Sequence, residues 1–199
     1  MLKLTLSAYR VMPWKNGGGT TTELYLEPAP ASLPGAPFLW RASIAKVASE
    51  GPFSPFPGCD RHIMCIAGPG MVLAGGPHGP IDLTTPDTPR SFSGDWPIVS
   101  SLVAGPVRDF NLIAWRAGVS TSLACLRPTK PIRLDCEAPC QVFLYLIAGE
   151  LDANGQRFAA GESILLDSPD SLELEPPPSV EPPRLAVCRI GPIRPPAGS

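Results

Sequence analysis

The sequence predicts an all-β protein, and three observations support this fold class. Its 27 prolines are spread through 199 residues instead of forming one block, and proline interrupts a helix but is tolerated at turns and strand ends. Short apolar runs lie between these prolines and 19 glycines, which is typical of many strands joined by turns. The motif C-I-A-G that ends at Gly68 has a counterpart, L-I-A-G, that ends at Gly149, and such a repeat indicates two similar β units.

A second repeated step follows each of these motifs. After a further apolar run, each half reaches a glycine followed by an acidic residue, at Gly94 and at Gly161. The spacing is longer in the first half, and the polar connection at residues 75–89 accounts for the difference. The expected parts of the chain are an N-terminal half at residues 1–105, a C-terminal half at residues 106–191 and a frayed tail at residues 192–199.

Alternation of apolar and polar side chains predicts the individual strands, because successive residues of a strand point to opposite faces. Arg41 and Ser43 would share one face of a strand, and Asp109 and Asn111 one face of another. The expected strands are residues 2–11, 20–27, 38–45, 63–67, 71–74, 98–103, 109–115, 125–134, 141–148, 151, 163–166 and 185–190.

The composition excludes several classes of protein. Sixteen basic residues stand against 18 acidic ones, for a net charge of −2, so the basic face that binds nucleic acid or an anionic membrane is not expected. No apolar run is long enough to span a membrane, and the first residues lack the apolar core of a signal peptide. We therefore expect a cytoplasmic protein whose six cysteines stay reduced.

The most unusual stretch is P-W-K-N-G-G-G-T-T-T-E at residues 13–23. Its three consecutive glycines allow left-handed backbone or a close approach of the backbone to another group. One interpretation is a hairpin connection, since N-G and G-G pairs are common in turns. The other is the backbone-lined edge of a small-molecule site. A phosphate loop is excluded, because Lys15 precedes the glycines and a strand follows them.

Familiar catalytic and metal sites are not indicated. The two histidines, His62 and His78, are far apart, whereas a metal-binding barrel needs two or three histidines with a carboxylate. Cys136 and Cys140 do not have the spacing of a zinc knuckle. No G-x-S-x-G motif occurs, and Cys59 stands next to Asp60, which would raise a thiol pKa. We therefore expect neither a metal nor another cofactor.

Several motifs together resemble one family. The second half reads L-I-A-G-E-L-x(3)-G-Q-R-F-x-x-G-E-x-I-L, which looks like one half of a cupin barrel. With residues 13–23, W-R-A-S-I-A, G-P-F-S-P-F-P-G-C-D-R and D-F-N, the chain resembles the HutD/Ves family of bicupins, associated with histidine utilisation. This resemblance implies two double-stranded β-helix halves (RmlC-like jelly rolls) in one chain and a role in binding a small ligand. Residues 112–116, L-I-A-W-R, depart from the family, which more often has a basic pair there.

The candidate ligand site combines cations, acids, neutral hydrogen-bonding groups and the glycine run. An arginine offers a two-pronged donor to a carboxylate, and the amides of the glycine run can cradle an anion. We expect Lys15 and Arg41 to hold a carboxylate, with Glu23 and Asn111 contacting the rest of the ligand. The full candidate set is Trp14, Lys15, Asn16, Gly17, Gly18, Gly19, Thr21, Glu23, Arg41, Ser43, Asp60, Arg61, Asp109 and Asn111.

Three functional classes remain open at this stage. The first is a non-metal bicupin that binds a small acidic or amino-acid-derived metabolite and acts as a sensor or regulator linked to histidine utilisation. The second is an enzyme, an isomerase or hydrolase, in which burial raises the carboxyl pKa of Glu23 or Asp109 for acid–base work. The third is a structural interaction protein with a filled barrel, held by pairs such as Arg41–Asp109 and Arg61–Glu23. A homodimer formed through an open strand edge is a further expectation.

Overall fold

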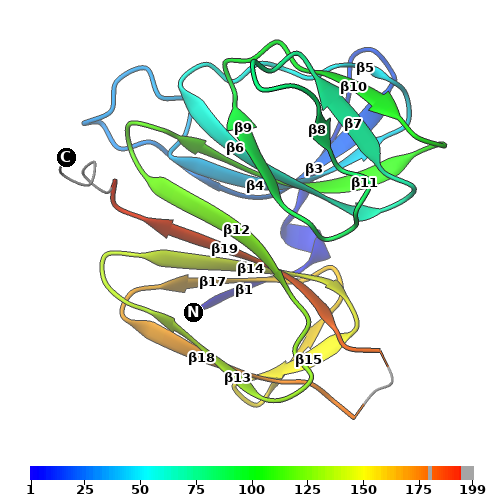
Figure 1. Ribbon diagram of the computed structural model, residues 1–199. Coiled ribbons are helices and arrows are strands. Elements are labelled where there is room, and N and C mark those ends of the chain that lie inside the picture. Colours follow the sequence, from blue (N-terminus) through cyan, green and yellow to red (C-terminus); the bar gives the residue numbers. More distant parts are fainter. Residues whose placement is uncertain (179–180, 194–199) are drawn as a thin grey trace. The chain divides into compact units, whose positions relative to one another are not determined.

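The computed structural model describes residues 1–178 and 181–193, and this part of the chain is all β, which confirms the predicted fold class (Figure 1). It contains one short 3-10 turn, η1 (Leu6–Ala8), and within the described ranges no helix is long and apolar enough to cross a membrane. The strands are β1 (Leu2–Leu4), β2 (Arg10–Pro13), β3 (Gly19–Glu27), β4 (Trp40–Val47), β5 (Gly51–Pro52), β6 (Cys59–Ala67), β7 (Met71–Ala74), β8 (Ile81–Asp82), β9 (Arg90–Ser93), β10 (Val99–Leu102), β11 (Val107–Trp115), β12 (Ser120–Leu126), β13 (Ile132–Cys136), β14 (Gln141–Ala148), β15 (Glu150–Ala153), β16 (Gln156–Ala159), β17 (Ser163–Asp167), β18 (Asp170–Glu175) and β19 (Arg184–Gly191).

The chain forms two compact units, and each is described by itself. The N-terminal unit comprises Tyr9–Val119, and the C-terminal unit comprises Met1–Ala8 with Ser120–Ser199. Each unit has a larger and a smaller antiparallel sheet, the two-layer arrangement that buries one face of each sheet.

The two units have the same strand topology, as expected for a bicupin, in which one chain contains two similar β-barrel halves. The smaller sheets run β5-β10-β7-β8 and β13-β18-β15-β16. The larger sheets contain β4-β11-β6-β9 and β12-β19-β14-β17 in the same neighbour order. Each strand of the first set therefore has its counterpart in the second, from β4 with β12 to β11 with β19. In Figure 1 the strands β13, β15 and β18 lie opposite β14, β17 and β19 within the C-terminal unit.

The repeat corrects the expected domain boundary near Gly105. Val107–Trp115 pairs along its length with β4 on one side and β6 on the other, so β11 belongs to the N-terminal unit. The units consequently divide after Val119 and not at residue 105. Of the expected tail, residues 194–199 lie outside the described residues.

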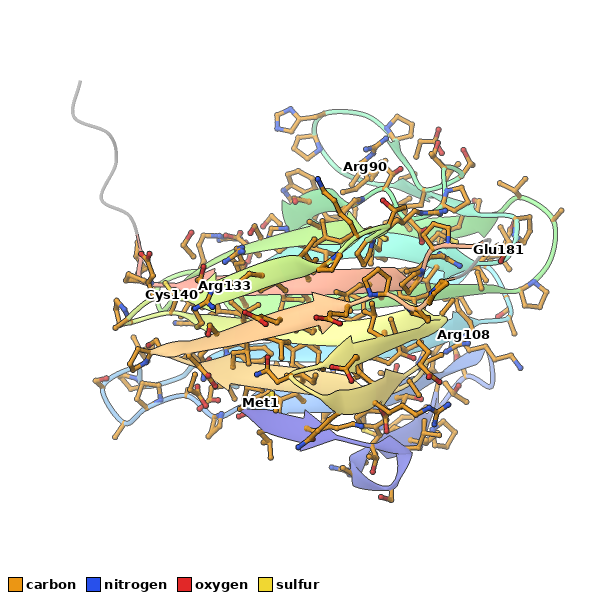
Figure 2. All side chains as sticks on the ribbon, turned by 90° about the horizontal axis from the view of Figure 1, so that it is seen from below. Met1, Arg90, Arg108, Arg133, Cys140 and Glu181 are labelled. Atoms are coloured by element: carbon orange, nitrogen blue, oxygen red, sulfur yellow. The ribbon has the colours of Figure 1, made fainter. Side chains whose placement is uncertain are left out.

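Two long strands expected from the sequence are each divided in the structure. Residues 2–11 form β1 and β2, separated by the 3-10 turn, and the two strands belong to different units. β1, which begins beside the labelled Met1 in Figure 2, pairs with β17 in the C-terminal unit. The Met1 ammonium lies 2.9 Å from a carboxylate oxygen of Asp170. The expected strand 125–134 is likewise split into β12 and β13, because prolines at positions 128 and 131 cannot donate to a ladder.

One of the two sequence repeats corresponds to equivalent positions, and the other does not. Gly68 and Gly149 both have positive φ, +95° and +84°, and both stand between counterpart strands, β6–β7 and β14–β15. A Cβ on Gly68 would lie 2.5 Å from the Pro106 carbonyl oxygen, so the position requires glycine. Gly94 follows β9, however, whereas Gly161 precedes β17, the counterpart of β9. The Gly-acid steps therefore do not occupy equivalent positions in the two units. The short polar strands β9 and β16, which lie between the apolar runs, were not predicted.

The interiors of the two units differ in chemistry. The C-terminal unit is filled by aliphatic and aromatic side chains, and Ser163 is its one buried polar residue within the described ranges. The N-terminal unit buries Ser43, Arg61, Asp109 and Asn111 beside its apolar cluster. The polar interior of the N-terminal unit is where a ligand site can form. The apolar cluster of the C-terminal unit comprises Leu134, Cys136, Val142, Leu144, Leu146, Leu151, Ala153, Phe158, Ile164, Leu166, Leu172, Leu174, Leu185 and Val187.

The filled interior of the C-terminal unit leads to a stability prediction. Phe158 is fully buried in that cluster, so Phe158→Ala should lower the free energy of unfolding by about 3–5 kcal/mol, through lost burial and the cavity left behind. The control is Leu6→Ala, since the Leu6 side chain is 71% exposed and its removal should change stability by less than about 0.5 kcal/mol. Urea unfolding followed by far-UV circular dichroism measures both, and equal losses would contradict the assignment.

Candidate functional site

Three rows of side chains cross the larger sheet of the N-terminal unit on one face. Cross-strand partners point to the same side of an antiparallel sheet, so the pairing of β3, β4, β11 and β6 aligns residues that are far apart in the sequence. The rows are Thr21–Ala45–Asp109, Glu23–Ser43–Asn111 and Arg41–Ile113–Arg61. The predicted faces of β4 and β11 are therefore correct, and the register places them beside the same pocket.

A pocket of about 570 Å³ opens over these rows, within the size range of small-molecule sites. Its walls combine the strand residues with the turn before β3 and the proline- and phenylalanine-rich segment after β5. The lining residues are Met12, Pro13, Trp14, Lys15, Asn16, Thr21, Arg41, Ser43, Ala45, Pro52, Phe53, Ser54, Phe56, Arg61, Asn111 and Ile113. Apart from Trp14, the apolar members were not predicted, although the G-P-F-S-P-F motif was the signal that could have pointed to Phe53 and Phe56.

The turn at residues 14–19 contributes Trp14, Lys15 and Asn16 to the pocket. The Trp14 indole nitrogen donates to Thr21 Oγ1 at 2.8 Å, which fixes the ring against β3. Asn16 Oδ1 accepts from the Gly18 amide at 3.0 Å, a local bond that closes the turn. Lys15 is exposed and has no hydrogen bond or ion pair within the described ranges, so its ammonium is available to a ligand.

The glycines of this turn do not line the pocket. A Cβ on Gly19 would lie 2.3 Å from the Lys46 carbonyl oxygen, and one on Gly18 would lie 2.5 Å from Ser49 Oγ. Gly17 has a φ of +72°, which favours glycine in any turn. Local packing at Gly18 and Gly19 and the positive φ of Gly17 therefore account for the three glycines, and close approach of a ligand is not needed to explain them.

Arg41 forms an ion pair that was not among those expected. Its Nε donates to Glu23 Oε2 at 2.7 Å, and the two side chains are only 13% and 20% exposed. The expected partners were Asp109 for Arg41 and Glu23 for Arg61. The bulge in β3 after Glu23 and the β3–β4 register bring Glu23 to Arg41 instead. Glu23 thus faces Arg41 and is absent from the pocket lining.

Arg61 is a buried cation that lies in the pocket wall. Its guanidinium lies over three aromatic rings, 5.2 Å from the Phe53 centroid, 5.4 Å from Phe56 and 5.0 Å from Phe92. Nη2 donates to Asn111 Oδ1 at 2.9 Å, while Nε has no partner in the described chain. Burial lowers the pKa of Arg61 to about 10, so it is still charged at neutral pH. A buried charged nitrogen without an acceptor is unfavourable, and a ligand oxygen would satisfy it.

Asp109 lies behind the pocket wall and is fully buried. Oδ1 accepts a hydrogen bond from Asn111 Nδ2, and Oδ2 has no partner within the described ranges. Burial raises the pKa of Asp109 to about 7, against the smaller opposing effects of the Arg61 charge and the Asn111 hydrogen bond. Asn111 therefore connects a buried cation on one side with a buried acid on the other.

Asp60 does not join this site. Its carboxylate lies 2.6 Å from Arg116 Nε on the surface, and Arg116 also contacts Asp95 at 3.0 Å. Asp95 accepts from the Gly58 amide at 2.8 Å, and this bond is the main reason why the pKa of Asp95 falls to about 2. The cluster holds the loop before β6 in place, so the role of Asp60 is to stabilise this loop.

The described residues contain no group of three or more His, Cys, Asp or Glu side chains that could hold a metal ion. His62 points to the face of β6 opposite Arg61, where its Nδ1 lies 2.7 Å from Ser91 Oγ. Burial lowers the pKa of His62, which favours the neutral imidazole.

The backbone contact at Gly19 predicts a specific pattern of stability. Gly19→Ala should lower the free energy of unfolding by about 1–3 kcal/mol, because its Cβ would meet a backbone carbonyl that cannot rotate away. Gly18→Ala is the matched control, since its Cβ would meet only the Ser49 hydroxyl, which can change rotamer. Chemical denaturation of both variants provides the test, and a larger loss for Gly18→Ala would contradict it.

The raised pKa of Asp109 predicts a pH-dependent stability. The free side chain has a pKa of about 3.9, so between about pH 4 and the folded value of about 7 the folded state holds a proton that the unfolded state releases. Wild-type stability relative to Asp109→Asn should therefore decrease as the pH rises through this window and level off above it. Urea unfolding of both proteins at about pH 5 and about pH 8 measures the difference, and a pH-independent difference would refute the prediction.

Comparison with known proteins identifies the family that the chain matches. Residues 6–182 match the HutD family. An uncharacterized 21.2 kDa protein in the hutC 3' region of Pseudomonas putida is 42% identical over 107 residues, which cover 53% of this chain and 53% of that protein. Protein Ves of Cronobacter sakazakii is 37% identical over 105 residues, or 52% and 54% of the two chains. These alignments span about half the length of the curated relatives.

Solved structures match over a longer part of the chain. HutD from Pseudomonas fluorescens SBW25 superimposes with a TM-score of 0.80 at 26% identity, covering 97% of this chain and 99% of that one. An oxalate decarboxylase from Lactobacillus farciminis gives a TM-score of 0.66 at 12% identity, covering 97% and 87%, which supports the shared fold alone. The family match and the repeated topology agree, and the chain belongs to the HutD family.

Proposed function

We propose that the N-terminal unit binds a small carboxylate metabolite and that the protein acts as a sensor or regulator in the cytoplasm. One observation carries this proposal: the pocket lining includes Lys15, Arg41 and Arg61, and no aspartate or glutamate is present among its described members. Cations in a partly dry cleft attract anions and favour them over neutral molecules.

Arg61 is the best placed of the three cations to bind the carboxylate. Its planar group is held by three aromatic rings and Asn111, so little side-chain freedom is lost when a ligand binds. Arg61 lines the pocket, so its charge can pair with a carboxylate there. Arg41 already shares its Nε with Glu23, so this revises the expected pairing of Lys15 with Arg41 at the carboxylate.

The remaining walls support a ligand with an apolar or planar body. Phe53, Phe56 and Ile113 line one part of the pocket, while Asn111, Ser43 and Thr21 offer neutral hydrogen-bonding groups. Lys15 at the exposed turn could receive a second acidic group. Intermediates of histidine breakdown such as urocanate and formiminoglutamate have this chemistry.

The relatives support the same direction. The Pseudomonas putida relative is named for the hutC 3' region, which supports the proposed link to histidine utilisation.

Binding is favoured over catalysis by the positions of the two carboxyl groups that were considered as acid or base. Asp109 has a pKa suited to proton transfer near neutrality, but it is not among the lining residues and Asn111 lies between it and Arg61. Glu23 is ion-paired with Arg41. Neither carboxyl group therefore faces a bound molecule in the described geometry.

The proposal is tested by thermal shift with urocanate and formiminoglutamate, against neutral sugars of similar size. At 100 times Kd, binding should stabilise the fold by about 2.7 kcal/mol, a rise in Tm of roughly 5–11 °C for a chain of this size. Lys15→Ala and Arg61→Lys should reduce the shift, because the first removes a charge and the second removes the planar donor group.

Lys46→Ala is the matched control, since Lys46 is also exposed but is absent from the pocket lining. It should keep the full shift. The proposal fails if millimolar acids give no shift, if sugars shift Tm equally, or if both pocket variants respond like the wild type.

A further inference from the structure

Three buried side chains form a continuous polar chain behind the pocket. Arg61 Nη2 donates to Asn111 Oδ1 at 2.9 Å, and Asn111 Nδ2 donates to Asp109 Oδ1. Two buried atoms of this chain have no partner in the described structure, Arg61 Nε and Asp109 Oδ2. Arg61 also lines the pocket, where its charge can pair with an anion, whereas Asp109 is absent from the lining and its unpartnered oxygen can take up a proton.

We propose that the pocket binds its carboxylate together with a proton, which is taken up by Asp109. The inference rests on the proposed function, since it requires an anion at Arg61. When the site is empty, the positive charge of Arg61 is the main compensation for an ionised Asp109. A carboxylate bound at Arg61 neutralises that charge, and the buried Asp109 carboxylate is then left uncompensated. Protonation of Asp109 Oδ2 removes the uncompensated charge.

The surroundings of Asp109 offer no alternative compensation in the described chain. Its neighbour on β4 is Ala45, and its neighbour on β6 is the thiol residue Cys65, whose Sγ donates to the Ala67 carbonyl at 3.4 Å. The buried cluster that contains both neighbours is otherwise apolar, with Met71, Leu73 and Ile98 among its members. Asn111 is on its own strand and uncharged. Arg61 is the cation that acts on Asp109, and Arg41 in turn acts on Arg61.

The sign of the coupling follows directly. The bound anion disfavours the ionised form of Asp109, so binding raises the pKa of that carboxyl above its value in the free protein, which is about 7. Carboxylate affinity should therefore increase as the pH falls toward and through about 7, and should level off where Asp109 is already protonated in the free protein. The carboxylate affinity has one limit at low pH, where Asp109 is protonated, and another at high pH, where it is ionised. For each unit by which binding raises the pKa of Asp109, these two affinities differ by a factor of ten.

The experiment is isothermal titration of the full chain with glutarate at about pH 7.5, in buffers of lower and higher ionisation enthalpy such as HEPES and Tris, since phosphate would compete for an anion site. Both carboxylates of glutarate stay ionised there, so the buffer dependence of the heat reports protons taken up by the protein. The expected result is uptake of a substantial fraction of one proton per glutarate bound, with affinity falling by up to about tenfold per pH unit above neutrality.

Asp109→Asn should still bind glutarate but with no proton uptake and a flat pH profile. Asp60→Asn is the control, because that exposed acid pairs with Arg116 away from the pocket, and it should keep the wild-type uptake. If Asp109→Asn does not fold, infrared difference spectra of the wild type replace it, and a new carboxylic C=O band on glutarate binding is expected. Binding without uptake, or without that band, overturns this inference alone. Absence of glutarate binding overturns the proposed carboxylate site together with it.

Discussion

The organisation of the N-terminal unit depends on the burial of one positive charge, that of Arg61. A guanidinium that is 6% exposed must be compensated by contacts from its surroundings. Phe53 and Phe56 after β5, Phe92 on β9 and Asn111 on β11 supply these contacts, so three separate segments are arranged around one side chain. The polar face of the larger sheet and the aromatic wall of the pocket both follow from this constraint.

Much of the fold could be predicted because its signals are local. Scattered prolines and the paired glycines at 68 and 149 indicated repeated strands and turns, and both glycines occupy equivalent left-handed positions in the structure. The boundary near Gly105 was wrong for a non-local reason. Whether β11 pairs with β4 and β6 or continues into the next half is decided by sheet pairing, which no periodicity along one strand reveals.

The candidate site was predicted in part for the same reason. Alternation identified the shared faces of Arg41 with Ser43 and of Asp109 with Asn111, and the structure retains both. Which acid meets which cation depends on register and on the bulge in β3, and neither is visible in the sequence. The three glycines were the strongest local signal, but their cause is packing against Ser49 and Lys46 at Gly18 and Gly19 and a left-handed backbone at Gly17. The aromatic wall was missed because phenylalanines in a proline-rich segment are equally typical of an ordinary core.

The repeated topology with two different interiors has a genetic consequence. One strand arrangement occurs twice, with an interior filled by hydrocarbon in one unit and a polar pocket in the other. Substitutions inside the filled unit should act on how much folded protein a cell contains, and growth at lower temperature should suppress them. In the unit with the pocket, substitutions at exposed lining residues such as Lys15 should leave that amount unchanged, whereas those at buried lining residues such as Arg61 should lower it. A random library sorted by abundance should therefore retain variants at exposed lining residues and lose variants at buried positions of both units.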